Sequence, residues 1–370
     1  MKLRLFVAAC SVLLSACTIG IVQMSDLTQV VSPLATPTLT ASWQVVNVDD
    51  KAGMAGSMVL DRYDHPHFAY ESEQFDLLHA RWTGYAWEKE KINTMDFGGG
   101  VSLTLDSNDN PHIAFSACNL FACTSHYTRY TGHEWTMVEL PFLAANVVVR
   151  VNATGTPHIS YGIVGQPGVR QLDYAYRNES EWVTHTLAYE IEDTSSCLQL
   201  DREGNPHISY LGPSGLIYTY QTGREWRSWL VDDTWEVDVG YALALDKDGN
   251  AHLSYHESGE DKLRYAFWDG QRWTVQTIET AGNKISGYTA IVIDASGNPH
   301  IAYITEDGIL KYAWREGSAW SSETVAAGVE YEYTDVSLVL DSLQQPHIGF
   351  HSSDGTNFSM VYAHKVAVQP

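Results

Sequence analysis

The stretch Asp294-Ala-Ser-Gly-Asn-Pro-His-Ile-Ala-Tyr303 decides the fold, because close copies of it recur along the chain. The other copies end in Pro66-His67-Phe-Ala-Tyr70, Pro111-His112-Ile-Ala-Phe115, Pro157-His158-Ile-Ser-Tyr161, Pro206-His207-Ile-Ser-Tyr210, Ala251-His252-Leu-Ser-Tyr255 and Pro346-His347-Ile-Gly-Phe350. Successive histidines lie 45 to 49 residues apart. A period in this range indicates an array of one supersecondary unit.

Each repeat contains four strand signals, which are clearest in residues 289–325. Residues 289–294 are rich in β-branched side chains, which favour strands. In the turn that follows, Asp294 can accept backbone N–H groups and Gly297 can take a positive φ. Residues 300–303, 310–314 and 320–325 supply three more strands. Four short antiparallel strands per unit predict the blade of a β-propeller.

A tryptophan marks the fourth strand of each unit. The series is Trp43, Trp87, Trp135, Trp182, Trp226, Trp273 and Trp320. Trp43 precedes the first complete unit, and the last unit ends after its third strand. The sequence therefore predicts an all-β, seven-bladed β-propeller with four antiparallel strands per blade, closed by the N-terminal strand (residues 43–48) completing the last blade. The alternative is an open array, which would leave an unpaired sheet edge.

The repeated histidine is not expected to bind metal. Equivalent atoms of different blades lie far apart, whereas metal sites need ligands that converge on one point. We predict that each histidine is neutral, buried and hydrogen-bonded between blades. The recurring third-strand tyrosines and the tryptophans are likewise expected to pack between blades. These tyrosines are Tyr174, Tyr218, Tyr265, Tyr312 and Tyr362.

Five repeats carry Gly-x-x-Trp before the fourth strand, as in Gly270 to Trp273 and Gly317 to Trp320. This pattern resembles the end of the Asp-box repeat, and residues 42–365 resemble the sialidase-like (BNR-type) seven-bladed propellers of bacterial lipoproteins. The resemblance implies a family of hydrolases, polysaccharide lyases and sugar-binding lectins. Sialidases of that family use an arginine triad and a Tyr–Glu pair, which no motif marks here. Arg150 is the only arginine in a first-strand segment near the axis.

The first residues indicate export. Lys2 and Arg4 precede a short apolar run, and Leu14-Ser-Ala-Cys17 resembles a bacterial lipobox. The resemblance implies cleavage before Cys17 and a lipid on its sulfur. We expect a signal peptide (residues 1–16), a lipidated N-terminus and flexible tether (17–41), and the propeller (42–366). The expected location is an extracytoplasmic membrane face, on the cell surface or the periplasmic side, with the lipid as anchor.

The net charge and the cysteines limit which ligands and cross-links the protein is expected to have. The net charge of −23 argues against a nucleic-acid ligand, because phosphates would be repelled. Cys118 and Cys123 predict a local disulfide outside the cytoplasm, with a metal site involving His126 as the alternative. Cys197 is expected to be a buried small apolar residue. We expect no cofactor, although Ca²⁺ is an alternative ligand of the acidic loops.

The variable loops are where function is expected. In a propeller, the connections between blades and those after the second strand share one face, around the mouth of the central channel. There, aromatic side chains stand beside carboxylates, a combination that suits a glycan or a cationic protein segment. The candidate ligand-binding residues are Tyr189, Glu192, Asp193, Trp235, Glu236, Asp238, Tyr241, Tyr288, Tyr331, Glu332 and Tyr333.

Three functions fit these observations. The first is a surface-anchored, non-catalytic binding propeller whose ligand is a glycan or protein. The second is a carbohydrate-active enzyme, a hydrolase or lyase, that uses mouth carboxylates such as Asp232, Asp233, Glu236 and Asp238 as acid and base. The third is a structural subunit of an envelope assembly.

The lipobox makes a direct prediction. The Cys17→Ser variant lacks the thiol that would carry the lipid, so it should leave the membrane fraction and appear in the soluble fraction. Fractionation followed by immunoblotting measures this. Retention of the variant in the membrane would contradict lipid anchoring through Cys17.

Overall fold

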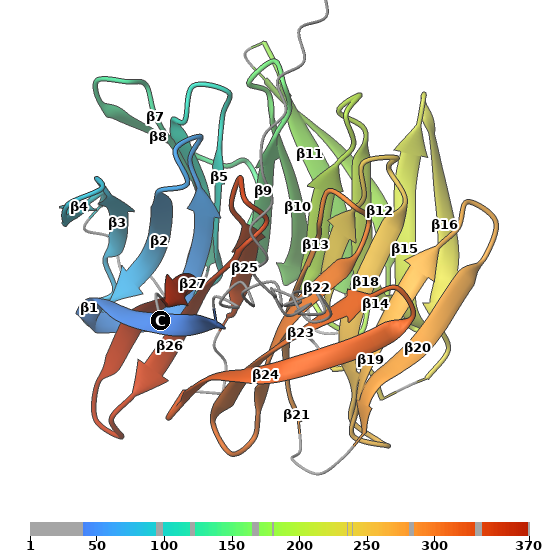
Figure 1. Ribbon diagram of the computed structural model, residues 1–370. Coiled ribbons are helices and arrows are strands. Elements are labelled where there is room, and N and C mark those ends of the chain that lie inside the picture. Colours follow the sequence, from blue (N-terminus) through green and yellow to red (C-terminus); the bar gives the residue numbers. More distant parts are fainter. Residues whose placement is uncertain are drawn as a thin grey trace, which may run out of the picture. The chain divides into compact units, whose positions relative to one another are not determined.

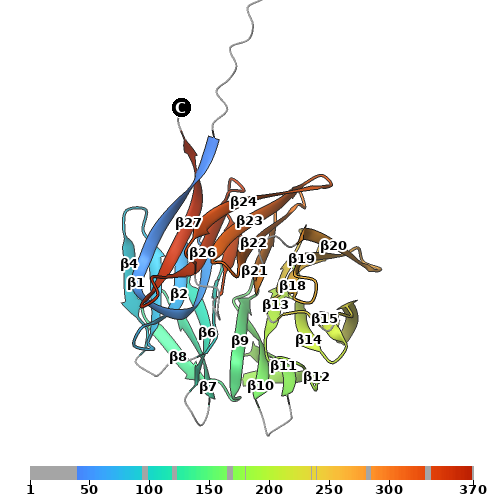
Figure 2. The same ribbon diagram turned by 90° about the horizontal axis from the view of Figure 1, so that it is seen from below.

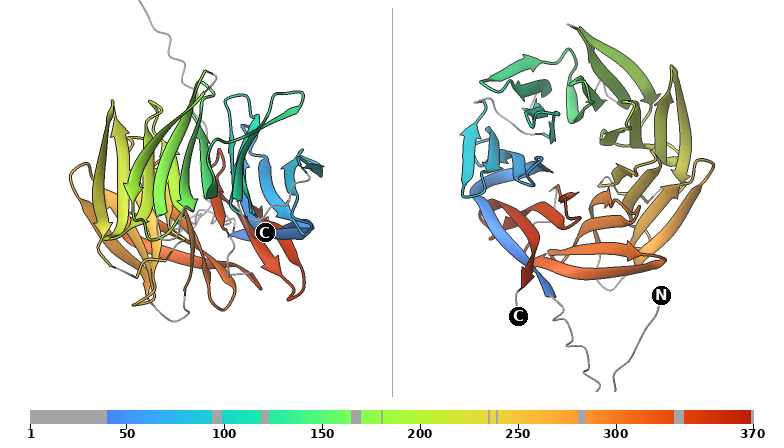
Figure 3. Two further views of the ribbon diagram at one scale, coloured as in Figure 1. Left: turned by 180° about the vertical axis from the view of Figure 1, so that it is seen from behind. Right: turned by 45° about the horizontal axis from the view of Figure 1, so that its top comes forward.

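The computed structural model describes residues 40–93, 99–118, 123–164, 170–179, 181–234, 236–238, 240–280, 285–329 and 335–368. The chain divides into the unit Ala41–Ala367 and a second unit, Met1–Thr40 with Val368–Pro370. The described residues form strands and turns, and no helix among them is long and apolar enough to cross a membrane. The sheets of the first unit are arranged in a ring about a central axis (Figure 3).

Strand pairing gives one large sheet and five smaller ones among the described residues. The large sheet contains, in spatial order, β25 (Ser337–Leu340), β26 (Pro346–Ser353), β27 (Phe358–Val368), β1 (Thr40–Leu60), β2 (Pro66–Ser72), β3 (Leu77–Trp82) and β4 (Trp87–Lys91). The next two sheets contain β5 (Val101–Leu105), β6 (Pro111–Cys118), β7 (Cys123–Tyr130) and β8 (Trp135–Glu139), then β9 (Ala144–Val151), β10 (Pro157–Val164), β11 (Arg170–Asn178) and β12 (Glu181–Tyr189).

The remaining sheets follow the same order around the ring (Figure 1). They contain β13 (Ser196–Leu200), β14 (Pro206–Gly212), β15 (Gly215–Thr222) and β16 (Glu225–Asp232), then β17 (Ala242–Leu245), β18 (Ala251–Glu257), β19 (Lys262–Trp268) and β20 (Trp273–Thr280), and finally β21 (Ile285–Ile293), β22 (Pro299–Thr305), β23 (Ile309–Glu316) and β24 (Ala319–Ala327).

The prediction of seven separate four-stranded blades is wrong. The described strands form six sheets, because the first and last sequence repeats share one seven-stranded sheet. The shared element is β1, which is 21 residues long. It lies beside β27 on one side (Figure 2) and pairs with β2 from Ala52 to Leu60 on the other. The sequence expectation treated residues 43–48 and the following strand as two elements.

Two glycines allow β1 to run without interruption from its place beside β27 to its pairing with β2. The ladder with β2 shifts register between Ala52 and Gly56. A Cβ on Gly56 would lie 2.3 Å from the Met360 side chain and 2.8 Å from that of His351. A Cβ on Gly53 would lie 2.6 Å from Glu71. Neighbouring side chains therefore fill the space that a larger residue would need, and the strand passes directly over them.

The predicted turn chemistry is confirmed. Asp294 Oδ1 accepts the backbone N–H groups of Ser296 at 2.9 Å and Asn298 at 2.7 Å, while Oδ2 accepts from the Asn298 side chain at 2.9 Å. Gly297 has a φ of 87°. Similar Asp-centred turns precede β6, β14 and β18. The second strand of the repeat follows this turn. All residues of β2, β18 and β22 are buried, so both faces of these second strands are covered.

Each repeated histidine bridges a turn and the third strand. His252 Nε2 lies 3.6 Å from the Asp246 carboxylate, and its Nδ1 lies 2.7 Å from the Tyr265 hydroxyl. Since the carboxylate can only accept, we place the ring proton on Nε2, and the tyrosine hydroxyl then donates to Nδ1. The same histidine–tyrosine pairing occurs in His112–Tyr127, His158–Tyr174, His207–Tyr218, His300–Tyr312 and His347–Tyr362.

The histidines are neutral and buried as predicted, but their hydrogen bonds are not between sheets. Burial lowers the pKa of His112, His158 and His252 to about 4. Their tyrosine partners lie on the adjacent strand of the same sheet, as β10 and β11 show. The prediction of histidine hydrogen bonds across the sheet interface is therefore wrong. Each of these histidine side chains bonds to the neighbouring strand of its own sheet.

The contact between neighbouring repeats is made by the tyrosine ring. Tyr265 of β19 packs edge-to-face against Trp320 of β24, with ring centroids 5.3 Å apart. Such pairs add about 0.5–1.5 kcal/mol beyond the burial of apolar area. The equivalent contacts are Tyr127–Trp182, Tyr174–Trp226, Tyr218–Trp273, Tyr312–Trp43 and Tyr362–Trp87, and His79–Trp135 in the first repeat. The expectation that these aromatic residues pack between units is confirmed.

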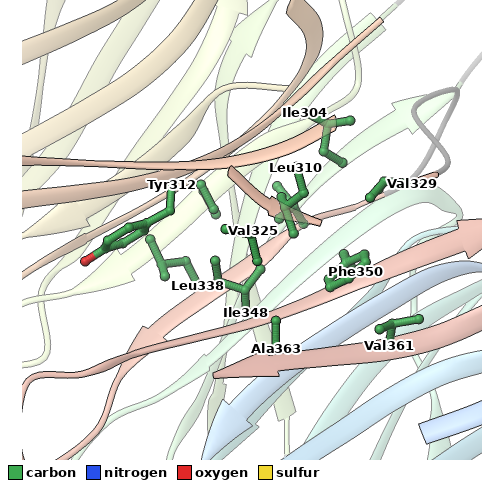
Figure 4. Close-up of a cluster of buried hydrophobic side chains, with 13 residues drawn as sticks. Ile304, Leu310, Tyr312, Val325, Val329, Leu338, Ile348, Phe350, Val361 and Ala363 are labelled. Atoms are coloured by element: carbon green, nitrogen blue, oxygen red, sulfur yellow. The ribbon is translucent and has the colours of Figure 1, made fainter. Parts of the chain in front are cut away.

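Trp43 makes the contact that joins β1 to the sheet of β21–β24. Its ring packs on Tyr312, and its Nε1 donates to Glu323 at 3.0 Å. Lys365 pairs with Glu323 at 2.6 Å and lies 5.5 Å from the centre of the Trp43 ring. An apolar cluster that includes Leu310 and Phe350 fills the same interface (Figure 4). The first and last strands are thus held against β24 by apolar packing and one ion pair.

Acid should destabilise the fold in a defined pH window. Because burial lowers the folded-state pKa of His112, His158 and His252 from 6.5 to about 4, the unfolded chain binds more protons between these values. Their contribution is complete above the unfolded pKa and falls as the pH drops towards 4, by about 1.4 kcal/mol per histidine per pH unit. Urea unfolding midpoints at pH 7, 6 and 5 should therefore decrease. An unchanged midpoint between pH 7 and 5 would contradict this account.

Removing the Trp43 ring should weaken the join between the chain ends. Trp43→Ala loses the contact with Tyr312 and the hydrogen bond to Glu323, so we expect a loss of about 3 kcal/mol in the free energy of unfolding. Tyr85→Ala is the matched control, since Tyr85 is 93% exposed, and it should change stability by less than about 0.5 kcal/mol. Denaturant unfolding compares the two. Equal stabilities would show that Trp43 does not hold the join.

Candidate functional site

Two connected cavities lie along the axis of the ring. They are lined by the first strands of the repeats: β1, β5, β9, β13, β17, β21 and β25. The cavity at the beginning of these strands has a volume of about 230 Å³ and the deeper one about 460 Å³. Both are lined in part by Ser57, Cys197, Tyr241 and Ser337, so they are consecutive parts of one channel.

Strand register determines which residues face this channel. The residue paired with each repeated histidine lines the deeper cavity, as Arg150 opposite His158 and Gln199 opposite His207 show. Because side chains alternate along a strand, the residue four positions earlier lies at the mouth. Asn146 is the example on β9. The channel therefore has a mouth and an interior with different chemistry.

Hydroxyl groups between these levels connect the first strands of neighbouring repeats. Ser57 Oγ accepts the backbone N–H of Leu103 at 3.1 Å, and Ser102 Oγ accepts that of Val149 at 3.1 Å. Ser337 Oγ accepts the N–H of Met58 at 3.1 Å. These serines line the channel but bind the adjacent strand, so their first role is structural.

The mouth contains two side chains that the sequence prediction did not select. Burial raises the pKa of Asp335 to about 6. Asn146 Nδ2 donates to Thr194 Oγ1 at 3.0 Å. Both lie twelve residues before a repeated histidine, His347 and His158. This constant offset is a signal that would have identified them.

The predicted tyrosines at the mouth have different roles. Tyr288 is half-buried and lines the mouth cavity. Tyr241 is buried, and its hydroxyl donates to the Ser195 carbonyl at 2.7 Å. Burial raises the pKa of Tyr241 well above its ordinary value, and the nearby Asp193 carboxylate adds to this. Tyr241 therefore joins β13 to β17, while Tyr288 contributes to the cavity wall.

The mouth carboxylates bind separate partners. Asp238 Oδ2 lies 2.6 Å from His256 Nδ1, and the Tyr255 hydroxyl donates to Asp232 at 2.5 Å. Glu236 is exposed, and its backbone carbonyl accepts from Ser258 at 2.7 Å. Asp232 and Asp238 are thus each bound to a side chain of β18.

The other predicted ligand-binding residues are only partly described. Tyr189 is 66% exposed and Glu192 is exposed, at the end of β12. Asp193 Oδ2 accepts the N–H of Ser195 at 2.7 Å. The prediction also included Trp235, Tyr331, Glu332 and Tyr333, which lie outside the described residues, as does the lipidation residue Cys17.

The described residues also cover the cysteine predictions only in part. Cys118 and Cys123 are paired across the β6–β7 ladder, but their side chains lie outside the description, so the disulfide stays a prediction. His126 Nε2 lies 2.9 Å from Thr124 Oγ1, and no group of metal-ligating side chains converges in the described residues. Cys197 donates to the Tyr241 carbonyl, and burial raises the pKa of its thiol to about 11.

A third cavity, of about 710 Å³, is a cleft between the sheet of β2–β4 and that of β5–β8. We call it the inter-sheet cleft, and it is lined by Tyr63, His79, Arg81, Glu88, Glu90 and Tyr130, among others. Arg81 donates from Nε at 3.0 Å and from Nη2 at 2.7 Å to Glu88. Tyr63 is 71% exposed. Charged and aromatic groups therefore meet in one accessible hollow.

The cleft lies where the first repeat departs from the common pattern. His79 occupies the place of the third-strand tyrosine, and it bonds to His67 at 3.1 Å and Glu90 at 3.0 Å. Arg81 stands opposite the repeated histidine. The corresponding residues are aromatic in the last five repeats, namely Tyr176, Tyr220, Phe267, Trp314 and His364. An arginine replaces a packed ring, so polar groups face this cleft.

No family model and no curated protein matches this chain. Solved structures share its fold: the BP39L lectin from Burkholderia pseudomallei has a TM-score of 0.61 at 12% identity, over 84% of this chain and 98% of that one. A fungal lectin from Aleuria aurantia, described as a six-bladed β-propeller with a novel fucose recognition mode, has a TM-score of 0.54 at 12% identity, over 77% and 99%. The Hadza microbial sialidase Hz136 has a TM-score of 0.51 at 12% identity, over 70% and 66%.

This likeness shows the β-propeller fold and no more, because the identities are low. The expectation of seven blades receives no support from the six-bladed lectin. The present chain likewise has six hydrogen-bonded sheets among its described residues, one of them seven-stranded.

Proposed function

We propose that this protein is a non-catalytic, carbohydrate-binding propeller, anchored through Cys17 at an extracytoplasmic membrane surface. The observation that carries the proposal is the inter-sheet cleft. Its volume of about 710 Å³ is within the range of small-molecule sites, roughly 300–1,000 Å³. At the cleft the first repeat has Arg81 where the last five repeats have an aromatic residue, and such a departure is where a binding site is expected to evolve on a repeating scaffold.

The side chains of the cleft suit a sugar ring. Arg81 offers fixed N–H donors, and Glu88 and Glu90 offer acceptors for hydroxyl groups. Tyr63 and Tyr130 provide flat apolar faces for the C–H side of a pyranose. Arg81 and Glu88 are paired to each other, and each retains capacity for further hydrogen bonds.

The structurally similar proteins agree with this choice of ligand class. Two of them are lectins, and the fungal one is described by its recognition of fucose. Fucose and simple hexoses are therefore the first ligands to test. The channel mouth, with Tyr288 and the exposed Tyr189 of the acidic loop face, is the second candidate position on the same protein.

A carbohydrate-active enzyme is less well supported. The carboxylates considered for catalysis, Asp232 and Asp238, are hydrogen-bonded to Tyr255 and His256. A glycosidase needs two carboxyl groups facing one glycosidic bond, about 5–10 Å apart. We therefore favour binding without turnover.

Binding should be measured on a glycan array, followed by calorimetry with the strongest ligand. Arg81→Ala removes the guanidinium donors from the cleft, so we expect affinity to fall by at least about tenfold, because a hydrogen bond to a charged group contributes about 1.5–3 kcal/mol. Arg129→Ala is the matched control: Arg129 has the equivalent position in the second repeat but does not line the cleft. It should bind like the wild type.

Three other outcomes would point to a different site or a different function. Loss of binding in Tyr288→Ala with full binding in Arg81→Ala would move the site to the channel mouth. Turnover of a polysaccharide would contradict the non-catalytic assignment. No binding to any glycan, together with copurification of an envelope protein, would favour a structural subunit.

A further inference from the structure

Among the described residues, the interior of the channel contains one cation and no counter-ion. Among the described residues that line the deeper cavity, Arg150 alone is charged. Its Nε donates to Gln199 Oε1 at 3.2 Å, and its Nη1 donates to the Val149 carbonyl at 2.8 Å. No carboxylate in the described part of the chain forms an ion pair with it. Asp335, the acid of the mouth cavity, does not line this deeper space.

The guanidinium is held in place by its neighbours. Gln199 Nε2 donates to the Leu243 carbonyl at 3.0 Å, so the amide oxygen of Gln199 is turned towards Arg150. This arrangement orients the guanidinium from β13 while its own strand β9 supplies the Val149 contact. Burial lowers the pKa of Arg150, yet an arginine stays charged in proteins. A positioned, charged group thus faces a cavity of about 460 Å³.

We propose that Arg150 is the anchor of a binding site for a small aliphatic monocarboxylate inside the channel. A charge removed from water is costly unless it is paired. A carboxylate provides two acceptor oxygens that match the fork of the guanidinium. A soluble anion of this kind would supply the partner that the described residues do not.

The rest of the cavity selects the ligand. Around Arg150, the same level of the channel is lined by Val59, Thr104, Ala244, Val292 and Val339. Four of these five side chains are apolar and suit a short hydrocarbon chain, whereas the inter-sheet cleft is lined by several charged groups. The net charge of −23 repels large polyanions at the surface, whereas a single carboxylate at physiological ionic strength is screened within about 8 Å.

The experiment measures thermal stability and calorimetric binding of the full chain with acetate, propionate and butyrate, at constant ionic strength. Saturating propionate should raise the Tm by about 3–5 °C. Propionamide has the same shape without the charge and should have no effect. Arg150→Gln should abolish the response to propionate, and Arg150→Lys should weaken it, because an ammonium lacks the planar pair of donors.

Three results would overturn the proposal. They are equal stabilisation by chloride and propionate, an equal response to propionate and propionamide, and full propionate binding by Arg150→Gln. The first two use the wild-type protein, so they decide the matter even if Arg150→Gln fails to fold. Arg81→Ala is the control variant, since Arg81 lies in the inter-sheet cleft and its loss should leave propionate binding unchanged.

Discussion

A buried histidine held between the turn and the third strand is the constraint on which each repeat depends. In the repeat of His300, Nε2 lies 3.5 Å from the Asp294 carboxylate and Nδ1 meets the Tyr312 hydroxyl. Leaving a buried polar group unsatisfied costs about 1–3 kcal/mol. The histidine thereby fixes the tyrosine ring, and the Tyr312 ring packs on Trp43 of β1. The hydrogen bonds around the turn thereby position the ring that packs against the neighbouring unit.

The ends of the chain are joined by one continuous strand. β1 lies beside β27 and also pairs with β2, so backbone hydrogen bonds cross the place where a ring of separate sheets would have a boundary. Close packing around Gly53 and Gly56 allows this passage. Trp43 repeats the tryptophan–tyrosine contact of the other units at the far end of the same strand. Edge strands are thus covered at both ends of the chain.

The candidate sites lie where the repeat is broken. At the inter-sheet cleft, His79 replaces the third-strand tyrosine and Arg81 replaces the aromatic residue of the last five repeats. In the channel, Arg150 stands where the other repeats have uncharged side chains such as Ala244 and Val292. In a repeating scaffold, the residues shared by the repeats form the packing contacts. The residues that differ between repeats are therefore available to bind ligands. Both proposed sites thus coincide with departures from the repeat pattern.

The sequence by itself determined the repeat unit, because the Asp turn, the Pro-His phrase and the tryptophans act through local geometry with a constant spacing. It also indicated that the histidines are structural. The number of sheets was decided only by the tertiary structure, since continuation of β1 depends on contacts between Gly56 and Met360, far apart along the chain. The inter-sheet cleft, lined by both Arg81 and Tyr130, was likewise invisible in the sequence. Residues of two sheets meet there only because the ring brings them together.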